Sequence, residues 1–516
     1  MDTSKGAVGR SGGGNQVSAV RTMAVFLLGS FVAILNQTLM NVALPHMMND
    51  LGVDAATIQW LITGYMLING VLVPISAYLV LTFSTKRLYL FAMGAFTLGS
   101  VVSGMAHTFP VLLAGRLIQA VGAGIIMPLM MNVFLTIFPP ASRGKAMGIM
   151  GLVMIFAPAV GPTLSGWIVE HYSWRLLFGL SIPFAALSLL LAQFWLTDVI
   201  ERTRPKLDLL GALFSFVGFG SLLYGLGRAG SLGWSNGEVV GTIALGLIFL
   251  VAFVIRELSA DQPILELRVF RYDIFAVTSL VSALMTMAMF AAMVLLPIYL
   301  QNIRGFTPVQ AGLLLLPGAL IMGFMSPIAG ALFDRIGARP LTIIGLLITL
   351  FTTWEFTKLT DTTGYGHILM LYSVRSFGMS LMMMTVMTEG LNQLPPSLNS
   401  HGTAVANTVR QVAGSLGTAL LVTVMTDRAA LHAEAMRTAM STADPGWFTA
   451  YQSAKAALAA ETGLPGEAAD QAMRLLLYGA VQKQAIIGGT NDAFVWATVL
   501  TVLALIASFF IRRART

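Results

Sequence analysis

The chain has 516 residues, of which 56% are hydrophobic and 10% are charged. A soluble domain carries charge on roughly 25% of its residues, so this composition excludes an ordinary soluble enzyme and a disordered protein and indicates an integral membrane protein. The net charge of +7 does not indicate nucleic-acid binding, because the basic residues cluster between apolar runs. With no cysteine and six histidines, none of them four residues from another, we expect no disulfide, no metal site and no cofactor.

The N-terminal segment, 1–21, is rich in glycine and serine and predicts a flexible tail rather than a cleavable signal. Apolar runs follow that are long enough to cross a bilayer as helices, which takes about 20 residues at about 1.5 Å each. Fourteen such runs are predicted, at 22–44, 57–82, 88–106, 109–135, 145–168, 175–196, 208–227, 238–255, 274–300, 309–332, 340–357, 366–391, 402–426 and 491–511. The runs are continuous rather than alternating, which excludes a β-barrel and predicts an all-α integral membrane protein.

Lysine and arginine are concentrated in alternate connections between these runs. The richer set includes Lys86 with Arg87, Arg143 with Lys145, and the basic tail 512–516. Basic residues favour the cytoplasmic side of a membrane, so this pattern predicts that both termini are cytoplasmic.

One long connection, 427–489, is predicted to lie outside the membrane on the external side. It contains AALHAEAMRTAM and EAADQAMRLLLYGA, which predict short helices around a turn at Pro445–Gly446. The resulting external hairpin either caps the outer mouth of the protein or takes part in substrate recognition.

Ionisable side chains inside apolar runs are functional candidates, because burying a charge in a bilayer costs about 2.5 kcal/mol or more. Arg116 and Arg375 lie at similar depths in the runs 109–135 and 366–391, and Glu389 lies near the cytoplasmic end of the latter. Gln119 lies one helical turn from Arg116, and Arg410 lies in the run 402–426. The alternative for Arg116 and Arg375 is a structural arginine neutralised by backbone carbonyls.

The run 145–168 combines small residues with prolines. Small residues allow close helix packing, and proline removes an amide donor and bends a helix. The pattern predicts either a pivot at a helix interface or a tightly packed helix. Its members are Gly148, Gly151, Pro158, Gly161, Pro162 and Gly166.

Four segments of the chain resemble the major facilitator superfamily, in its fourteen-helix drug:proton antiporter branch (EmrB/QacA-like), and bring the chain closer to the lincomycin-resistance type within that branch. They are NQTLMNVALP (36–45), RLIQAVGAG (116–124), GIMGLVMIFAPAVGPTLSG (148–166), which is similar to the branch's antiporter motif, and GALFDRIGAR (330–339), which is similar to its cytoplasmic loop motif. The chain departs from the branch at Asn36, where many members carry Asp, and at Leu81 and Ser84 in the first-half loop.

The resemblance implies a bacterial plasma membrane protein with two six-helix bundles, 22–200 and 258–511, and two inserted helices in 201–257. It implies alternating access by rocking of one bundle against the other. It also places Arg116 and Arg375 in pseudo-symmetric positions of the central cavity.

A cytoplasmic gate is expected at the second-half loop motif. Asp334 is predicted to bond the amides at the start of the next run, 340–357, where the helix dipole is positive. The alternative is a simple turn at Gly337. The remaining residues assigned to this gate are Gly330, Arg335 and Arg339.

For proton coupling, we expect Arg116 and Arg375 to act with Glu389 as the proton acceptor. The substrate cavity is expected to be large and apolar, because methionine adapts its shape to varied ligands, although methionine also packs helices. Its candidate residues are Asn36, Gln37, Asn41, Gln119, Asn132, Met287 and Met383.

The resulting hypothesis is a secondary transporter, not an enzyme, that exports small amphipathic drugs in exchange for protons. The alternative is an exporter or flippase of a lipid-like or endogenous metabolite on the same fold. The expected partners are the substrates, protons and membrane lipids, with no nucleic acid, and the protein is expected to be a monomer.

Overall fold

The computed structural model describes residues 12–200, 202–203, 208–260, 262–440 and 445–512, and these contain helices but no β-strand. Fourteen helices are long and apolar enough to cross a membrane, which confirms the predicted number of spans. They are α1 (Gly12–Leu51), α3 (Trp60–Thr82), α4 (Thr85–Gly104), α5 (Phe109–Ile137), α6 (Arg143–His171), α7 (Leu176–Trp195), α8 (Leu209–Leu232), α9 (Gly237–Ser259), α10 (Asp273–Ile298), α11 (Pro308–Ile336), α12 (Ala338–Glu355), α13 (Tyr365–Asn392), α14 (Asn399–Ala439) and α16 (Gly466–Ser508). Two further helices are the short α2 (Ala55–Ile58) and α15 (Pro445–Thr462).

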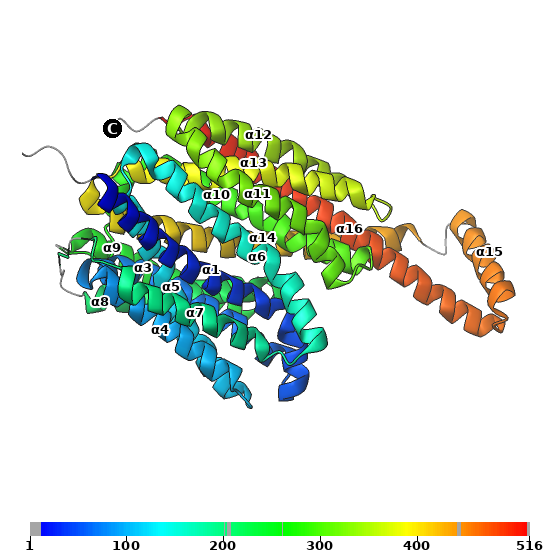
Figure 1. Ribbon diagram of the computed structural model, residues 1–516. Helices are drawn as coiled ribbons and strands as arrows, with labels where there is room; N and C mark the ends of the chain where they lie inside the picture. Colours follow the sequence, from blue (N-terminus) through cyan, green and yellow to red (C-terminus); the bar gives the residue numbers. More distant parts are fainter. Residues whose placement is uncertain (1–11, 201, 204–207, 261, 441–444, 513–516) are drawn as a thin grey trace, which may run out of the picture.

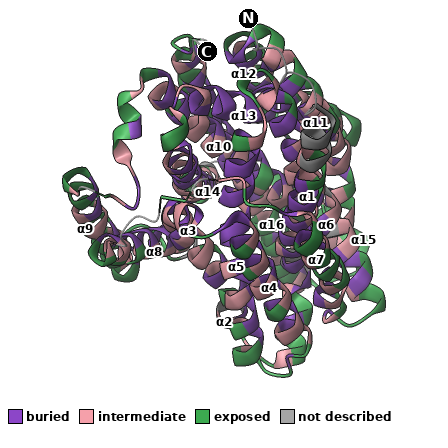
Figure 2. Cartoon of the chain, turned by 60° about the vertical axis from the view of Figure 1, so that its left-hand side comes forward, coloured by how far each residue is buried: buried purple, intermediate pink, exposed green. Residues whose placement is uncertain are grey.

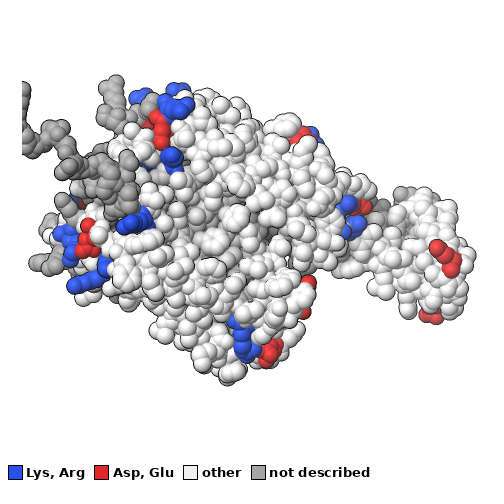
Figure 3. All heavy atoms as spheres, viewed as in Figure 1, with Lys and Arg blue, Asp and Glu red and all other residues white. Residues whose placement is uncertain are grey.

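The molecule has two ends, separated by a belt that lacks charge on the face shown in Figure 3. The terminal end is where α1 begins and α16 ends, and the hairpin end is where α15 lies (Figure 1). Large apolar side chains such as Leu187 and Leu347 are exposed in the middle of helices that run between the two ends. An exposed apolar belt of this kind is suited to contact with lipid.

The spanning helices form two bundles, α1 with α3–α7 and α10–α14 with α16. Helices α8 and α9 pack on each other, and α8 also contacts α3 and α14, so that this pair lies to one side of the bundles (Figure 2). The bundles meet mainly through α6 against α11 and α3 against α14. Each of these contacts joins a helix of the first bundle to a helix of the second.

The hydrophobic core is shared by the two bundles at the terminal end and divided at the hairpin end. One cluster joins Phe134 of α5 to Leu391 of α13 and Val405 of α14. At the hairpin end, Trp174 belongs to a cluster within the first bundle, and Phe494 belongs to a separate one within the second. The described conformation is therefore closed between the bundles at the terminal end.

The segment 427–489 was predicted to form separate short helices, and the structure differs from this prediction. The two predicted short helices are continuations of α14 and α16, which run well past the membrane-spanning length, and the Pro445–Gly446 pair opens α15 (Figure 1). No proline interrupts 399–439 or 466–508, so each helix continues until the chain turns. His432 of α14 and Asp492 of α16, with Nε2 and Oδ2 3.0 Å apart, join the two helices.

At the hairpin end, Asp50 in the last turn of α1 is tied to the two residues that precede α7. Its Oδ2 accepts hydrogen bonds from Arg175 at 2.8 Å and from the Trp174 indole at 3.0 Å. The Arg175 bond, followed by the Trp174 bond, holds the pKa of this carboxyl below its ordinary value.

We expect the stabilisation from Asp50 to be present above the pKa of an unfolded aspartate, about 3.9, and to disappear as pH falls through the lower folded pKa. The side chains are 47% and 27% exposed, so solvent screening limits the effect to about 1 kcal/mol or less. Thermal unfolding of wild type and Asp50→Asn should differ at pH 7 and converge below pH 4. If the difference in unfolding temperature between wild type and Asp50→Asn stays constant across this pH range, the carboxylate of Asp50 does not stabilise the fold.

Candidate functional site

Arg116 lies in α5 with its side chain enclosed by the first bundle and 1% exposed. Its Nη1 donates to Asn36 Oδ1 of α1 at 2.7 Å and to Gln119 Oε1 at 2.9 Å. The guanidinium also lies over the ring of Tyr65 in α3, 4.3 Å from the ring centre. A cation is attracted by the face of an aromatic ring, so the charge is balanced by a ring and by amide dipoles.

This network continues into two further helices. Gln119 Nε2 donates to Ser100 Oγ of α4 at 2.7 Å, and Asn36 Nδ2 donates to Ser181 Oγ of α7 at 3.4 Å. The described partners of Arg116 are neutral groups, so a buried positive charge is held here by dipoles. The structure thus brings together three of the predicted residues, Arg116, Asn36 and Gln119.

The other predicted polar residues of the first bundle lie outside this network. Gln37 is partly buried on the neighbouring position of α1, and the side chain of Asn41 lies outside the described residues. Asn132 is 2% exposed and donates to the Pro128 carbonyl of its own helix at 2.9 Å.

Arg375 of α13 lies in the second bundle and is 4% exposed. Its Nη2 donates to the Ala288 carbonyl of α10 at 2.9 Å, and its Nε donates to Thr353 Oγ1 of α12 at 3.4 Å. The contact with the Ala288 carbonyl is what we expect of the alternative, a structural arginine neutralised by backbone carbonyls.

Glu389 lies near the end of α13 and is 3% exposed, so it is a buried carboxyl and not a hydrated surface group. It belongs to the terminal end of its helix, whereas Arg116 lies near the hairpin end of α5. The structure therefore does not bring Glu389 and Arg116 together, and any coupling between them must pass through the helices.

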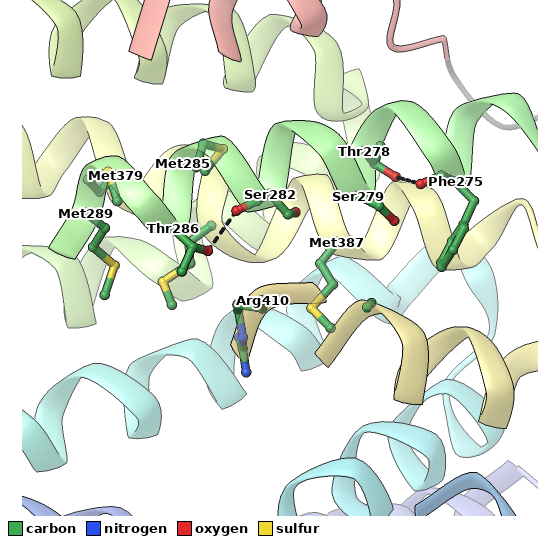
Figure 4. Close-up of a pocket in the computed structure, with 12 residues that line it drawn as sticks. Phe275, Thr278, Ser279, Ser282, Met285, Thr286, Met289, Met379, Met387 and Arg410 are labelled. Atoms are coloured by element: carbon green, nitrogen blue, oxygen red, sulfur yellow. Dashed lines mark hydrogen bonds between the residues drawn. The ribbon is translucent and has the colours of Figure 1, made fainter. Parts of the chain in front are cut away.

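A narrow pocket with a cavity volume of about 30 Å³, partly open to solvent, lies between α10, α13 and α14 (Figure 4). Its lining residues are Phe275, Thr278, Ser279, Ser282, Met285, Thr286, Met289, Met379, Met383, Met387, Ala406 and Arg410. Met383 was predicted as a cavity residue and lines this pocket, whereas the backbone of Met287 packs on Gly417 of α14.

Sequence analysis assigned no role to the hydroxyl side of this pocket or to Arg410. The signal was present in the spacing, because Thr278, Ser282 and Thr286 recur every four residues and therefore share one face of a helix. Met379, Met383 and Met387 have the same spacing on α13.

Asp334 joins the two bundles at the terminal end. Its Oδ1 accepts from the Gly144 amide at 2.9 Å and its Oδ2 from the Lys145 amide at 3.1 Å. The prediction that it bonds the start of the following helix was wrong: the amides belong to α6 of the other bundle. The first amides of a helix lack intrahelical partners, and those of α6 are within reach because glycines allow α6 and α11 to touch.

Glycines shape this crossing. A Cβ on Gly330 would overlap with the Gly144 carbonyl, and Gly337 ends α11 with a φ of 80°, a conformation that favours glycine. The two basic residues of the motif, Arg335 and Arg339, are exposed nearby. A second link, missed by sequence analysis, is the bond from Arg143 Nη1 to Asn392 Oδ1 of α13 at 2.8 Å.

The predicted antiporter motif lies along α6 and faces both bundles. Gly148 and Gly151 pack against Ser326 of α11, Gly161 packs against Thr38 of α1, and Gly166 lies close to Val309 of α11. Pro158 is partly buried within the same continuous helix, and the side chain of Pro162 lies outside the described residues.

Comparison with known proteins identifies the family to which the chain belongs. The family model of the Major Facilitator Superfamily matches residues 26–418. An uncharacterized MFS-type transporter, YhcA of Bacillus subtilis (strain 168), is 52% identical over 97% of this chain and 94% of that protein. The lincomycin resistance protein LmrB of the same organism is 38% identical over 97% of both chains.

A solved structure, that of the human organic anion transporter MFSD10 (TETRAN), has a TM-score of 0.62 and 14% identity, covering 95% of this chain and 99% of that one. At this identity the likeness concerns the fold alone. Together with the fourteen spans and the two bundles, these matches show that the chain is a transporter that belongs to the major facilitator superfamily, in its drug-transporter branch.

Proposed function

We propose that this protein exports amphipathic drugs by proton-coupled antiport with alternating access. The observation that carries the proposal is the α6–α11 crossing, where glycines bring the bundles together and Asp334 bonds them at one end. Helices in close contact through small residues can rock, and a few hydrogen bonds at one end give two alternative states. The name of the relative LmrB, a lincomycin resistance protein, supports a drug as the cargo.

The orientation completes this proposal. Basic residues such as Lys86, Arg87, Arg143 and Arg512 lie at the terminal end, which the positive-inside rule assigns to the cytoplasm. The shared core is then the cytoplasmic seal, and the described conformation is the outward-facing state, in which a substrate leaves the cell.

For proton coupling, we assign Glu389 as the proton acceptor. Arg116 and Arg375, the buried charges of the two bundles, are assigned to act with it. An antiporter requires that protonation and substrate binding favour opposite states of the same equilibrium. Glu389 is a buried carboxyl near the bundle contacts at the terminal end, within one helical turn of Asn392.

The assignment predicts that Glu389→Gln in proteoliposomes loses most transport driven by a pH gradient, about tenfold or more, but retains substrate exchange without a gradient. Lincomycin and the neutral dye N-phenyl-1-naphthylamine are the probes, and pH and Na⁺ gradients are imposed separately. The matched control is Glu355→Gln, which removes a carboxyl that pairs with Lys358 at 2.8 Å at the hairpin end. Unchanged pH-driven transport in both Glu389→Gln and Arg116→Ala would rule the scheme out.

A further inference from the structure

The pocket between α10, α13 and α14 has an asymmetric chemistry. Among its described lining residues, Arg410 carries the one charge and no residue carries a carboxylate. Methionines of α13 form one wall, and α10 contributes the hydroxyls of Thr278, Ser282 and Thr286 together with Met285 and Met289 (Figure 4). The pocket therefore offers a polarisable apolar wall and a single cation.

Arg410 differs from the two other arginines in the middle of spans. Arg116 and Arg375 are 1% and 4% exposed and enclosed by their own bundles, whereas Arg410 is partly exposed and reaches the pocket. Its described hydrogen bond runs from Nη2 to the neutral Asn407 Oδ1 at 3.1 Å. A guanidinium has five N–H donors in a planar fork, so most of its capacity remains for a ligand.

The position of Arg410 is central. It lies about 17 Å along α14 from Asn399, at about 1.5 Å per residue, which is near the middle of a bilayer core of about 30 Å. Its partner Asn407 also contacts Met131 of α5, with Nδ2 and Sδ 3.9 Å apart. The arginine therefore lies where the two bundles meet, and transporters of this architecture bind substrates at the interface of their repeats.

We infer that this pocket binds amphipathic substrates that carry an anionic or strongly hydrogen-bond-accepting group, with that group on Arg410 and the apolar body against the methionines. This inference rests on the proposed export function and narrows its substrate class. A cationic compound in the same pocket meets a like charge without a lining carboxylate to balance it, and repulsion is strong where water is scarce. Cations are therefore disfavoured at this site.

The test uses two probes that differ by one anionic group, 8-anilinonaphthalene-1-sulfonate and the neutral N-phenyl-1-naphthylamine. Binding is measured to the full chain in phosphatidylcholine nanodiscs. We expect Arg410→Gln to raise the Kd of the sulfonate about tenfold or more, because a charge-assisted hydrogen bond is lost. The Kd of the neutral probe should change less than twofold. Arg410→Lys should retain part of the preference, and Arg437→Gln, an exposed arginine of the same helix, should change neither value.

Met383→Ala should weaken both probes by a similar factor, because it removes apolar contact from either. Tetraphenylphosphonium should displace the neutral probe more readily from Arg410→Gln than from wild type. Equal weakening of the sulfonate and the neutral probe in Arg410→Gln would show a structural role for the arginine and overturn the inference, as would the absence of any effect.

Gradient-driven transport in the same variants separates this inference from the proposed function. If pH-driven drug export is intact but sulfonate binding does not depend on Arg410, the substrate class is wrong and the export function stands. If sulfonate binding depends on Arg410 but no gradient drives flux, the pocket stands and proton-coupled export fails.

Discussion

Gly330→Ala is expected to open the terminal end of the protein and to reduce transport by more than tenfold. The added methyl group would overlap with the Gly144 carbonyl on α6, where neither backbone can move without separating the helices. Overpacking of this kind costs about 1–3 kcal/mol, which changes the ratio of two conformations by roughly 5- to 150-fold. Asp334 would also lose its bonds to the Gly144 and Lys145 amides, because these require the same close approach.

The measurement is the distance distribution between spin labels at the terminal end. The chain contains no cysteine, so Arg87→Cys and Ile336→Cys provide one unique pair at exposed positions in the two bundles. The control is Gly323→Ala on the same helix, where an added Cβ meets nothing within 4 Å. Asp334→Asn should shift the distribution in the same direction by a smaller amount. If Gly330→Ala and Gly323→Ala give the same distances, the crossing is not a gate.

The membrane-spanning helices were predictable because their signal is local. Each apolar run is long enough to cross a bilayer, and its length can be counted without knowing its neighbours. The same reasoning found Arg116, because a charge in an apolar run is visible in sequence. Its pairing with Gln119 was indicated by a spacing of three residues.

Contacts between distant helices were not predictable in this way. The unpaired amides at the start of either α6 or α12 could donate hydrogen bonds to Asp334. The start of α12 is nearer in sequence, but the amides that bond Asp334 are those of α6. The choice is made by the close approach of α6 and α11, which depends on Gly144 and Gly330 together. Gly144 and Gly330 are far apart in the chain, and nothing in the sequence around either glycine indicates that the two are in contact.

The pocket was predicted in part for a related reason. A run of methionines on α10 and α13 indicates apolar faces, but the period alone does not say which face meets the other bundle. Met383 lines the pocket and Met287 does not, although both lie in methionine-rich helices. Arg410 was visible as a charge in a span, yet its access to the pocket depends on how α14 lies against α10 and α13.

Arg116→Met is expected to abolish transport driven by a pH gradient while the protein still folds. Without the guanidinium, Asn36 Oδ1 and Gln119 Oε1 lose a donor, and each loss costs about 1–3 kcal/mol. This cost is offset because a buried charge held by neutral groups is itself expensive. Stability should therefore change little, whereas the charge at the centre of the first bundle is removed. The measurements are thermal unfolding and pH-driven flux on the same preparation.

Companion variants distinguish the charge from the shape of the side chain. Arg116→Lys retains the charge, but its ammonium cannot reproduce the planar stacking on Tyr65 while donating to both amide oxygens, so we expect partial flux. Tyr65→Phe keeps the ring under the guanidinium and should transport normally, whereas Tyr65→Leu removes it and should resemble Arg116→Lys. If Arg116→Met retains flux but unfolds at a much lower temperature, the arginine is a structural support of its bundle, and the coupling role must lie with Arg375 and Glu389 in the other.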